Sequence, residues 1–512
     1  MNQMRTTRPV FVYILVLSCI FGNRHSMIAT ATLFPSVEVT LTSRGIEFLK
    51  DDFFKDILRD AKRYRQDLDS FERDVGKFNL QMRSLSLSHL KVGSLLVGVE
   101  PGLIAELTFN NVSINMVGRW HSTRKVEKNY KNVSGWNRVQ DRGWMRGHLR
   151  NGTVGILVSL MEIDQTNFSI DCRYDTPPMS IEFMGNDRLS GTLVSGQATD
   201  VTRVMLCEHF QNSLRRYWDR NPVLGVHYYL RNYLVLDYPL IGEPRVLLGQ
   251  NTISVDTPPP KNIQFRLESA YHWYNSSGFP FAPIPLPKFQ PPSEYEGVLP
   301  MLVFVISEYI PNTLFYTLYH NDLLQFYIQP DSVDDKYKGI MRAVCNGFCL
   351  DDILSTENIE KYKEAELEVL IKSTDVPKFD IKDGDISLTT PGSLAFYGRF
   401  PSNVSEYLFT FSLEATYRVA LTAHRWRLNA QFNLDAVQEL NLVKSYVGTV
   451  NSPTMDRLFR GINRIFIESR LQELGREGFP LPLPESIELT NAHLHILNGA
   501  IAVWGDMVKS VL

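Results

Sequence analysis

The segment between Arg119 and Asn151 holds the residues best suited to contact a charged ligand. Nine basic side chains outnumber two acidic ones there, with Trp120, Trp136 and Trp144 among them. The basic residues are Arg119, Arg124, Lys125, Lys128, Lys131, Arg138, Arg142, Arg146 and Arg150. Basic side chains attract anionic head groups, and tryptophan prefers the boundary between water and lipid. We therefore predict a surface that binds anionic head groups; a solvated charged hairpin is the alternative interpretation.

The sequence offers little for catalysis or for metal and cofactor binding. It contains no G-x-S-x-G, H-E-x-x-H or phosphate-binding P-loop motif, and its 11 histidines are scattered. His493 and His495 lie on one face of an expected strand, but no third metal ligand accompanies them. Cys345 and Cys349 lack the C-x-x-C spacing of redox-active pairs. We expect no metal, no cofactor and no enzymatic activity.

The N-terminus has the pattern of a secretory signal peptide. A basic stretch, Met1–Arg8, precedes the apolar run Pro9–Gly22, and a small-x-small cleavage pattern follows at Ala29–Ala31. The run is shorter than the ~20 residues that span a bilayer, so an uncleaved signal anchor is the less favoured alternative. An exported chain can be glycosylated at N-x-S/T sequences, and this chain has six of them, at Asn111, Asn132, Asn151, Asn167, Asn275 and Asn403. We predict an extracellular, secreted glycoprotein.

Four cysteines remain beyond the signal segment, namely Cys172, Cys207, Cys345 and Cys349. An even number of cysteines in an oxidising compartment favours disulfides over metal ligation or catalysis. Three connectivities are open. We favour Cys172–Cys207 together with Cys345–Cys349, and the second pair is the less certain one.

Composition and length indicate a globular chain of several domains. The 512 residues are 44% hydrophobic and 21% charged, which is typical of folded proteins. A chain of this length is too long to fold around one ordinary hydrophobic core. The formal net charge of −3 excludes a general nucleic-acid binder, which would be strongly basic. Prolines concentrate in residues 256–300, including Pro258-Pro259-Pro260. Such density favours a semi-rigid, extended connector between two halves.

The two halves share a layout of helices around long strands. Each opens with a strand, at Val37–Leu41 and Met301–Ile306, and a serine, Ser43 or Ser307, then caps a helix. Each closes with a helix, over Val201–Trp218 and Thr454–Leu474. Residues between the helices alternate between apolar and polar, most strictly over 407–422, which indicates amphipathic strands. Periodicity does not reveal whether such a core is filled or hollow.

Several local strings resemble the family of bactericidal/permeability-increasing protein, lipopolysaccharide-binding protein and the plasma lipid transfer proteins. They are VTLTSRGIEFL (39–49), GFPFAPIPLPKF (278–289), VISEYIPNT (305–313) and LQELGREGFPLPLPESIEL (471–489), together with the pair Cys172 and Cys207. No single string is decisive, but their order and spacing match over nearly the whole chain beyond the signal segment.

The resemblance implies an α+β fold in the form of an elongated boomerang. Each of two barrels would be a twisted antiparallel sheet wrapped around helices, and a central sheet and the proline-rich linker would join them. The expected division is a signal peptide (1–31), an N-terminal barrel (32–255), the linker and central sheet (256–300) and a C-terminal barrel (301–512). The family's conserved disulfide would correspond to Cys172–Cys207. Cys345 and Cys349 have no counterpart in it.

The resemblance also implies one apolar pocket in each barrel, able to hold phospholipid acyl chains. In the N-terminal barrel we expect its walls to include Ile46, Leu49, Phe53, Ile57, Leu206, Phe210 and Leu214. In the C-terminal barrel we expect Ile310, Leu314, Leu318, Leu458, Ile462 and Phe466. Each of these residues could equally be plain core. The basic segment would lie at the outer tip of the first barrel, where basic family members bind lipopolysaccharide.

The sequence therefore predicts a secreted protein that binds and transfers phospholipid and makes peripheral contact with membranes or lipid particles. The main alternative is an innate-defence protein that binds bacterial lipopolysaccharide through the basic tip. Mild acidity and glycosylation favour transfer, whereas the basic segment favours defence. A secreted hydrolase with a scattered active site and a receptor-binding ectodomain with filled barrels are rivals from other classes.

Overall fold

The structure is a computed structural model, and the residues that it describes belong to one compact unit, Pro35–Leu512. These residues are 35–75, 78–99, 105–130, 133–160, 168–184, 191–220, 234–236, 246–259, 261–273, 299–332, 341–344, 350, 354, 356–382, 384–424, 427–450, 452–481 and 487–509. The expected signal peptide, most of the proline-rich segment, Cys345, Cys349, Lys131 and the acceptors Asn132, Asn167 and Asn275 lie outside the described residues. Among the described helices, none is long and apolar enough to cross a bilayer.

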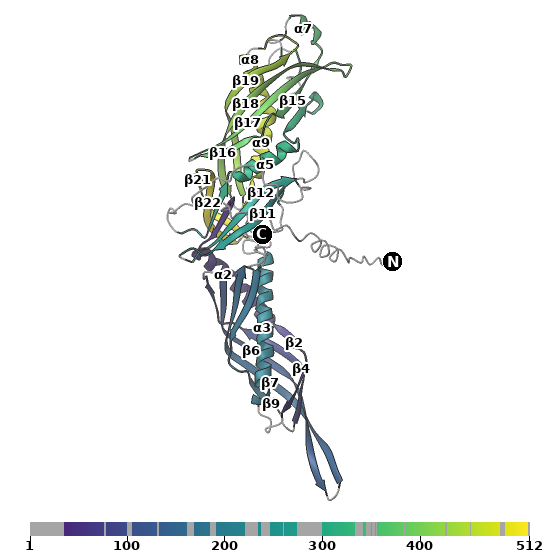
Figure 1. Cartoon of the computed structure of the whole chain (residues 1–512), viewed down its shortest axis with the longest axis vertical. Coiled ribbons are helices and arrows are strands. Elements are labelled where there is room, and N and C mark those ends of the chain that lie inside the picture. The colour runs from purple at the N-terminus through teal and green to yellow at the C-terminus, as the bar shows by residue number, and fades with distance from the viewer. Residues whose placement is uncertain are drawn as a thin grey trace, which may run out of the picture. The chain divides into compact units, whose positions relative to one another are not determined.

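An antiparallel sheet of long strands builds the N-terminal half (Figure 1). Its main path runs through β2 (Arg65–Leu68), β4 (Phe78–Lys91), β6 (Ala105–Tyr130), β7 (Val133–Leu160) and β8 (Phe168–Asp175). Three shorter strands pair with β4, β6 and β7, namely β3 (Phe71–Val75), β5 (Ser94–Gly98) and β9 (Ser180–Met184). Strict alternation of burial along β6, with Val112, Ile114 and Met116 inward, gives the sheet one apolar face.

A second antiparallel sheet builds the C-terminal half. It runs through β14 (Gln325–Ile328), β15 (Glu366–Ser373), β17 (Asp385–Arg399), β18 (Ser405–His424), β19 (Arg427–Ser445) and β20 (Phe479–Pro480), and β16 (Lys378–Lys382) pairs with β17. The predicted amphipathic strand over residues 407–422 is β18. The short helices η1 (Pro330–Ser332) and α7 (Thr356–Lys361) also belong to this half.

A third sheet joins strands from both halves, as the predicted fold class requires. Its order is β10 (Leu234–Leu236), β11 (Val246–Asp256), β12 (Ile263–Trp273), β1 (Val37–Leu41), β13 (Leu302–Ser307), β22 (Ala500–Lys509) and β21 (Ile487–Leu497). The two opening strands pair directly, with Val39 opposite Phe304. The chain is thus an α+β protein with antiparallel sheets, as predicted, although most strands of the central sheet come from outside residues 256–300.

Helices pack against the apolar face of each outer sheet. In the first half α2 (Ser43–Arg63) is capped one residue earlier than expected, because the Thr42 hydroxyl accepts a hydrogen bond from the Gly45 amide at 3.4 Å. The closing helix α3 (Thr192–Arg220) begins at Thr192 rather than Val201. Ser195 donates to the Met179 carbonyl at 2.6 Å, and Thr199 accepts from the Met179 amide at 2.8 Å. These tertiary bonds hold helical a stretch whose Ser and Thr content is typical of a loop.

In the second half α5 (Tyr309–His320) opens the layer of helices, and the amide of Tyr309 donates to the Ser307 hydroxyl at 3.1 Å. The closing helix is interrupted. It consists of α8 (Ser452–Ile462), the π-helical segment η3 (Asn463–Ile467) and α9 (Glu468–Glu477). A side chain at Gly475 would collide with the carbonyl oxygen of Ala430, so this glycine lets α9 lie close against β19.

Candidate functional site

A cavity of about 880 Å³, partly open to solvent, lies between the C-terminal sheet and the helical segments α5, α8, η3 and α9. This volume falls within the range of ligand pockets. The sheet contributes the apolar lining residues Ile328, Ile371, Leu388, Leu394, Leu413, Ala415 and Tyr417. The helices contribute Phe315, Leu318, Phe459, Ile465, Phe466, Ile467, Leu471 and Leu474. Because both walls are apolar, the space between them suits hydrocarbon better than water.

The π-helical segment shapes one wall of this cavity. Its extra residue per turn redirects the side chains of Ile465, Phe466 and Ile467, all of which line the cavity. The segment is anchored by a buried hydrogen bond that the Tyr417 hydroxyl donates to the Asn463 side chain. Burial raises the pKa of Tyr417, so the phenol stays protonated and keeps this bond at physiological pH. No pattern in the sequence predicted this π-helical segment.

Polar and charged side chains line the cavity together with the apolar ones. Arg470 and Glu473 on α9 form an ion pair of 2.9 Å. Lys372 and Arg476 also line the cavity and are exposed, and neither forms an ion pair with a described residue. An apolar interior with a few charged groups is the usual design of a site for an amphiphilic ligand.

The residues predicted for the C-terminal pocket divide between cavity and core. Leu318 and Phe466 line the cavity. Ile310, Leu458 and Ile462 are buried in the hydrophobic core beside it, and Leu314 is partly buried against that core. Residues that line the cavity and residues of the core follow the same apolar spacing in the sequence. Spacing alone therefore does not distinguish one group from the other. A role of all six in lipid binding stays a prediction.

The residues predicted for the N-terminal pocket are all buried. Ile46 and Leu49 belong to the core around the central sheet, whereas the others belong to the N-terminal core, namely Phe53, Ile57, Leu206, Phe210 and Leu214. Aromatic rings meet across that core. Phe109 of β6 stacks on Phe210 of α3 with centroids 4.1 Å apart. Contact between sheet and helix thus fills this part of the interior, and lipid binding by these residues stays a prediction.

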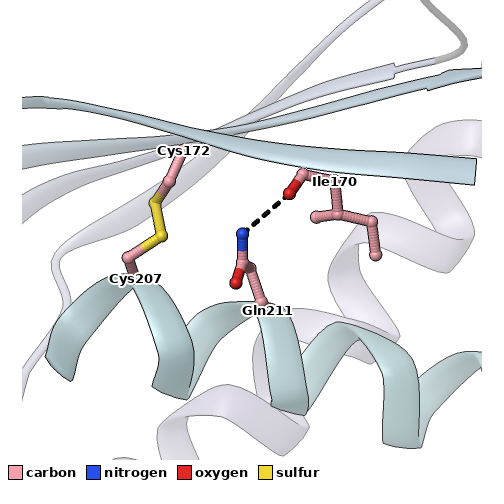
Figure 2. Close-up of a disulfide and its surroundings, with 4 residues drawn as sticks. All are labelled: Ile170, Cys172, Cys207 and Gln211. Carbon is pink, nitrogen blue, oxygen red and sulfur yellow. Dashed lines mark hydrogen bonds between the residues drawn. A yellow bond between two sulfur atoms is a disulfide. The ribbon is translucent and has the colours of Figure 1, made fainter. Parts of the chain in front are cut away.

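The predicted disulfide Cys172–Cys207 is present and joins β8 to α3 (Figure 2). One helical turn further along, the Gln211 side chain donates a hydrogen bond of 2.8 Å to the Ile170 carbonyl, also on β8. Figure 2 shows both links on the side of the helix that faces the strand. One side of α3 is therefore held to the sheet by one covalent bond and one hydrogen bond.

The basic segment forms the long hairpin of β6 and β7 (Figure 1). Arg119, Arg142, Arg146 and Arg150 are exposed on its described part. Arg124, Lys125, Lys128 and Arg138 lie on the same two strands, and Lys125 pairs in register with Arg138. Lys131 lies outside the described residues. The segment is a charged hairpin, the form named in the alternative interpretation, and binding of anionic head groups by its basic residues stays a prediction.

Cross-strand register gathers an amphipathic row on the outer face of this sheet. Arg83 of β4 lies opposite Arg119, Arg119 opposite Trp144, and Trp144 opposite Met184 of β9. The Arg119 guanidinium lies 4.9 Å from the Trp144 ring centroid, a cation–π contact, and the Trp144 side chain remains 54% exposed. Trp120 is instead a core residue, 2% exposed. Sequence spacing could not reveal Arg83 and Met184, because register joins them.

Three of the six predicted glycosylation acceptors are described. Asn111, Asn151 and Asn403 are exposed, and each has a left-handed backbone, with φ of 53°, 55° and 62°. The side-chain oxygen of Asn403 accepts hydrogen bonds from Arg399 at 2.8 and 3.1 Å. The side chains of all three asparagines are accessible on the folded surface, and their glycosylation stays a prediction.

A polar cavity of about 460 Å³ lies along α3, next to the end of α2 and the start of β2. Its lining residues are Tyr64, Gln66, Met205, Glu208, His209, Asn212, Arg215 and Arg216. His209 packs edge-on against Tyr64 with centroids 4.6 Å apart. Burial lowers the pKa of His209 to about 4, with Asp60 opposing the shift and Arg216 adding to it. The imidazole is therefore neutral at physiological pH.

His209 should make the stability of the protein depend on pH. Between its ordinary pKa of 6.5 and its folded value of about 4, the unfolded chain binds a proton that the folded chain does not. The contribution of His209 to the free energy of unfolding should therefore be largest above pH 6.5 and should decrease as the pH falls toward 4. In His209→Gln this decline should be shallower than in the parent protein, as measured by urea unfolding at several pH values. The exposed His493→Gln serves as control; equal slopes in all three proteins would contradict the assignment.

Comparison with known proteins finds similar proteins that cover most of the chain. Residues 261–508 match the model of the LBP/BPI/CETP family, C-terminal domain. A bactericidal permeability-increasing protein of Sebastes schlegelii is 19% identical over 507 residues, covering 96% of this chain and 99% of that protein. A lipopolysaccharide-binding protein of Mus musculus is 22% identical over 489 residues, covering 92% and 93%. A crystal structure of lipopolysaccharide binding protein has 16% identity and a TM-score of 0.49, covering 94% of this chain and 100% of that one.

Proposed function

Because the chain belongs to the LBP/BPI/CETP family, we propose that it is a secreted lipid-binding protein, without enzymatic activity, that holds phospholipid acyl chains in its C-terminal cavity. The observation that carries the proposal is the cavity of about 880 Å³ between an apolar sheet face and apolar helices. Binding of this kind needs no reactive group.

The energetics favour hydrocarbon as the occupant. Each buried CH₂ contributes roughly 0.8 kcal/mol relative to water, so even part of one acyl chain would bind favourably from solution. A chain drawn from a bilayer has already gained most of that energy. The cavity must therefore offer an equally apolar environment, and side chains such as Leu394, Leu413 and Phe466 provide it. Charged residues such as Lys372 and Arg476 would then contact the head group.

The proposal is tested by what the purified protein carries. Extraction with organic solvent followed by mass spectrometry should recover phospholipid close to one molecule per cavity. After incubation with labelled phospholipid, the protein should return the label chemically intact, which separates a carrier from a hydrolase. Protein that remains free of lipid under both conditions would refute the carrier function and favour an ectodomain with filled interiors.

A second candidate function is the binding of lipopolysaccharide through the exposed face of the β6–β7 hairpin. The row of Arg83, Arg119, Trp144 and Met184 favours it, because it places guanidinium groups beside exposed apolar side chains. Guanidinium groups suit phosphates, and the apolar groups suit the lipid boundary. The two relatives compared above carry names that refer to bacterial permeability and lipopolysaccharide binding. The proposed phospholipid site is the C-terminal cavity and the proposed lipopolysaccharide site is the β6–β7 hairpin, so the two functions can be tested separately.

Substitutions on the hairpin should weaken binding to anionic lipid surfaces. The triple variant Arg142→Ser/Trp144→Ala/Arg146→Ser removes two charges worth about 1 kcal/mol each, which alone weaken binding roughly 30-fold, and one interfacial ring, so we expect a loss of more than that. Sedimentation with lipopolysaccharide or anionic vesicles at low salt measures it. Raising the salt should weaken the parent protein more steeply than the variant, because the charges are exposed. Arg418→Ser, an exposed arginine of the other half, is the control. Unchanged binding by the triple variant would rule out this surface.

A further inference from the structure

Four tyrosine side chains form a continuous row across the strands of the C-terminal sheet. They are Tyr327 of β14, Tyr397 of β17, Tyr407 of β18 and Tyr446, which follows β19. Successive ring centroids are 6.4, 5.6 and 5.5 Å apart, and each pair meets edge to face. The two end residues, Tyr327 and Tyr446, are 47% and 63% exposed, and the inner two are half-buried. An exposed apolar row of this length is typical of a binding surface.

A sugar ring is the ligand whose chemistry matches such a row. The face of an aromatic ring is slightly negative and its edge is slightly positive. A sugar presents polarised C–H groups on one face, which pack against aromatic faces, and hydroxyls around its rim, which form hydrogen bonds with phenol hydroxyls. Because neighbouring tyrosines are turned nearly at right angles, the row offers aromatic faces and phenol hydroxyls together.

The turn between β17 and β18 brings the glycosylation acceptor Asn403 beside this row. Arg399 and Ser405 lie opposite each other at the base of the turn, and the next pair on the same face is Tyr397 opposite Tyr407. Residues two apart on a strand share a face and are roughly 7 Å apart. The serine of the N-x-S sequence and the two inner tyrosines therefore lie on one surface.

A buried carboxylate links the acceptor sequence to the row. Ser405 donates a hydrogen bond of 2.8 Å to Glu368, and the Tyr327 hydroxyl donates to the same carboxylate oxygen. Glu368 is only 2% exposed, so its carboxylate is covered on the side where these donors lie. These hydrogen bonds fix the position of the turn relative to the tyrosines.

Arg399 fixes the orientation of the Asn403 amide. Its guanidinium donates to the Asn403 Oδ1 atom at 2.8 and 3.1 Å, and because a guanidinium only donates, the amide oxygen must face it. Arg399 is held in turn by Asp331 at 3.2 Å. The Nδ2 atom of Asn403, which carries the sugar in an N-linked glycan, donates no hydrogen bond to a described residue. The attachment atom is therefore free, and the amide that bears it is held in place.

We propose that Asn403 carries an N-linked glycan whose first sugars pack along Tyr397 and Tyr407. Each contact between a sugar and an aromatic ring is weak, but attachment at Asn403 raises the effective concentration of the sugar at the row. The chain's own glycan therefore occupies this surface in preference to dissolved carbohydrate. The inference goes beyond lipid binding. It rests on the secretion that the proposed function includes, and not on the content of the C-terminal cavity.

Glycopeptide mass spectrometry and deglycosylation test the proposal on full-length protein secreted from eukaryotic cells. Asn403 should carry a glycan, and a peptide N-glycosidase should release it at least roughly tenfold more slowly from the native parent than from native Tyr397→Leu/Tyr407→Leu. Leucine stays apolar but removes the ring, and neither tyrosine is among the residues that line the described cavity. Tyr174→Leu, at a 45% exposed tyrosine of β8, is the control and should keep the parent's rate. Equal native rates for all three proteins overturn the proposal.

A double-mutant cycle separates packing of the glycan from a purely structural role of the tyrosines. In glycosylated protein, Tyr397→Leu/Tyr407→Leu should raise the unfolding equilibrium constant roughly fivefold more than it does in the Asn403→Gln background, where no glycan is attached. Urea unfolding of the four proteins gives this difference. Equal effects in the two backgrounds would mean that the tyrosines stabilise only the sheet, and would overturn the proposal.

Other occupants of the row give different results. If the double tyrosine variant weakens binding to phosphatidylcholine vesicles and leaves the release rate unchanged, the row contacts a lipid surface and the proposal is overturned. An Asn403 without a glycan overturns it too, whether or not the other acceptors are occupied. Failure of the proposed function is a separate result, because it appears as an organic extract without phospholipid, which Asn403→Gln should not change.

Discussion

Replacing Phe466 with aspartate should lower the affinity of the C-terminal cavity for phospholipid roughly 100-fold, which corresponds to about 3 kcal/mol. Phe466 is half-buried and lines the cavity from the π-helical segment. In the empty protein the new carboxylate is hydrated by water in the open cavity. When acyl chains fill the cavity, they displace that water and leave an unpaired charge in hydrocarbon, which is the origin of the cost.

The measurement is lipid retention by native mass spectrometry together with competition against a fluorescent phospholipid. Val443→Asp provides the matched control, because Val443 is 63% exposed on the outer surface of β19 and the same carboxylate remains hydrated there with or without lipid. Both variants should keep native circular dichroism and a cooperative urea transition, which separates loss of binding from loss of folding. If Phe466→Asp retains as much lipid as the control, the cavity is not the acyl-chain site.

Several strands and helices were predicted from the sequence, because their positions depend on local periodicity. The alternation over residues 407–422 predicted β18, and the apolar spacing of Ile46, Leu49 and Phe53 predicted α2. The first turns of α3 escaped prediction, because hydrogen bonds to Met179 hold them and these bonds join segments distant in sequence. The π-helical segment was not predicted for the same reason, because its anchor, Tyr417, lies on the strand β18, which is distant in sequence.

The candidate sites were predicted less completely than the fold. Leu318 lines the cavity while Ile310, on the same helix, is plain core. An inward-facing apolar side chain has the same sequence pattern in both situations, because the distance between helix and sheet decides whether space remains. The tryptophans of the basic segment are different. Trp120 was expected on the surface that binds head groups but continues the buried series of Val112, Ile114 and Met116, whereas the cross-strand register places Trp144 opposite the outward Arg119.

The polar cavity on α3 could not be anticipated from spacing, since Tyr64 and Gln66 reach it from another part of the chain. Its position beside the aromatic core of the N-terminal half makes the fastening of α3 important. Phe210, which stacks on Phe109, and His209, which lines the cavity, are neighbours on this helix. The contacts that hold α3 in place therefore position both the aromatic core and the polar cavity.

Removing the disulfide should lower the free energy of unfolding of the N-terminal half by about 4 kcal/mol, the value expected for a cross-link that closes a loop of this length. Cys172 and Cys207 are separated by 35 residues, and without the bond the unfolded chain regains the freedom of that loop. The double variant Cys172→Ala/Cys207→Ala should unfold at a lower urea concentration, followed by circular dichroism and tryptophan fluorescence, and reduction of the parent protein should have the same effect.

Gln211→Ala is the matched control, because it removes the neighbouring hydrogen bond to Ile170 and leaves the covalent link intact. Its cost should be near 1 kcal/mol, the usual net value of a hydrogen bond. The larger effect of the double variant would then be caused by loss of the cross-link, which closes the loop in the unfolded chain, and not by a general loss of contact between α3 and β8. Equal unfolding midpoints for the double variant and the parent would mean that packing of Phe210 and its neighbours alone fixes the helix, and that the bond adds no stability.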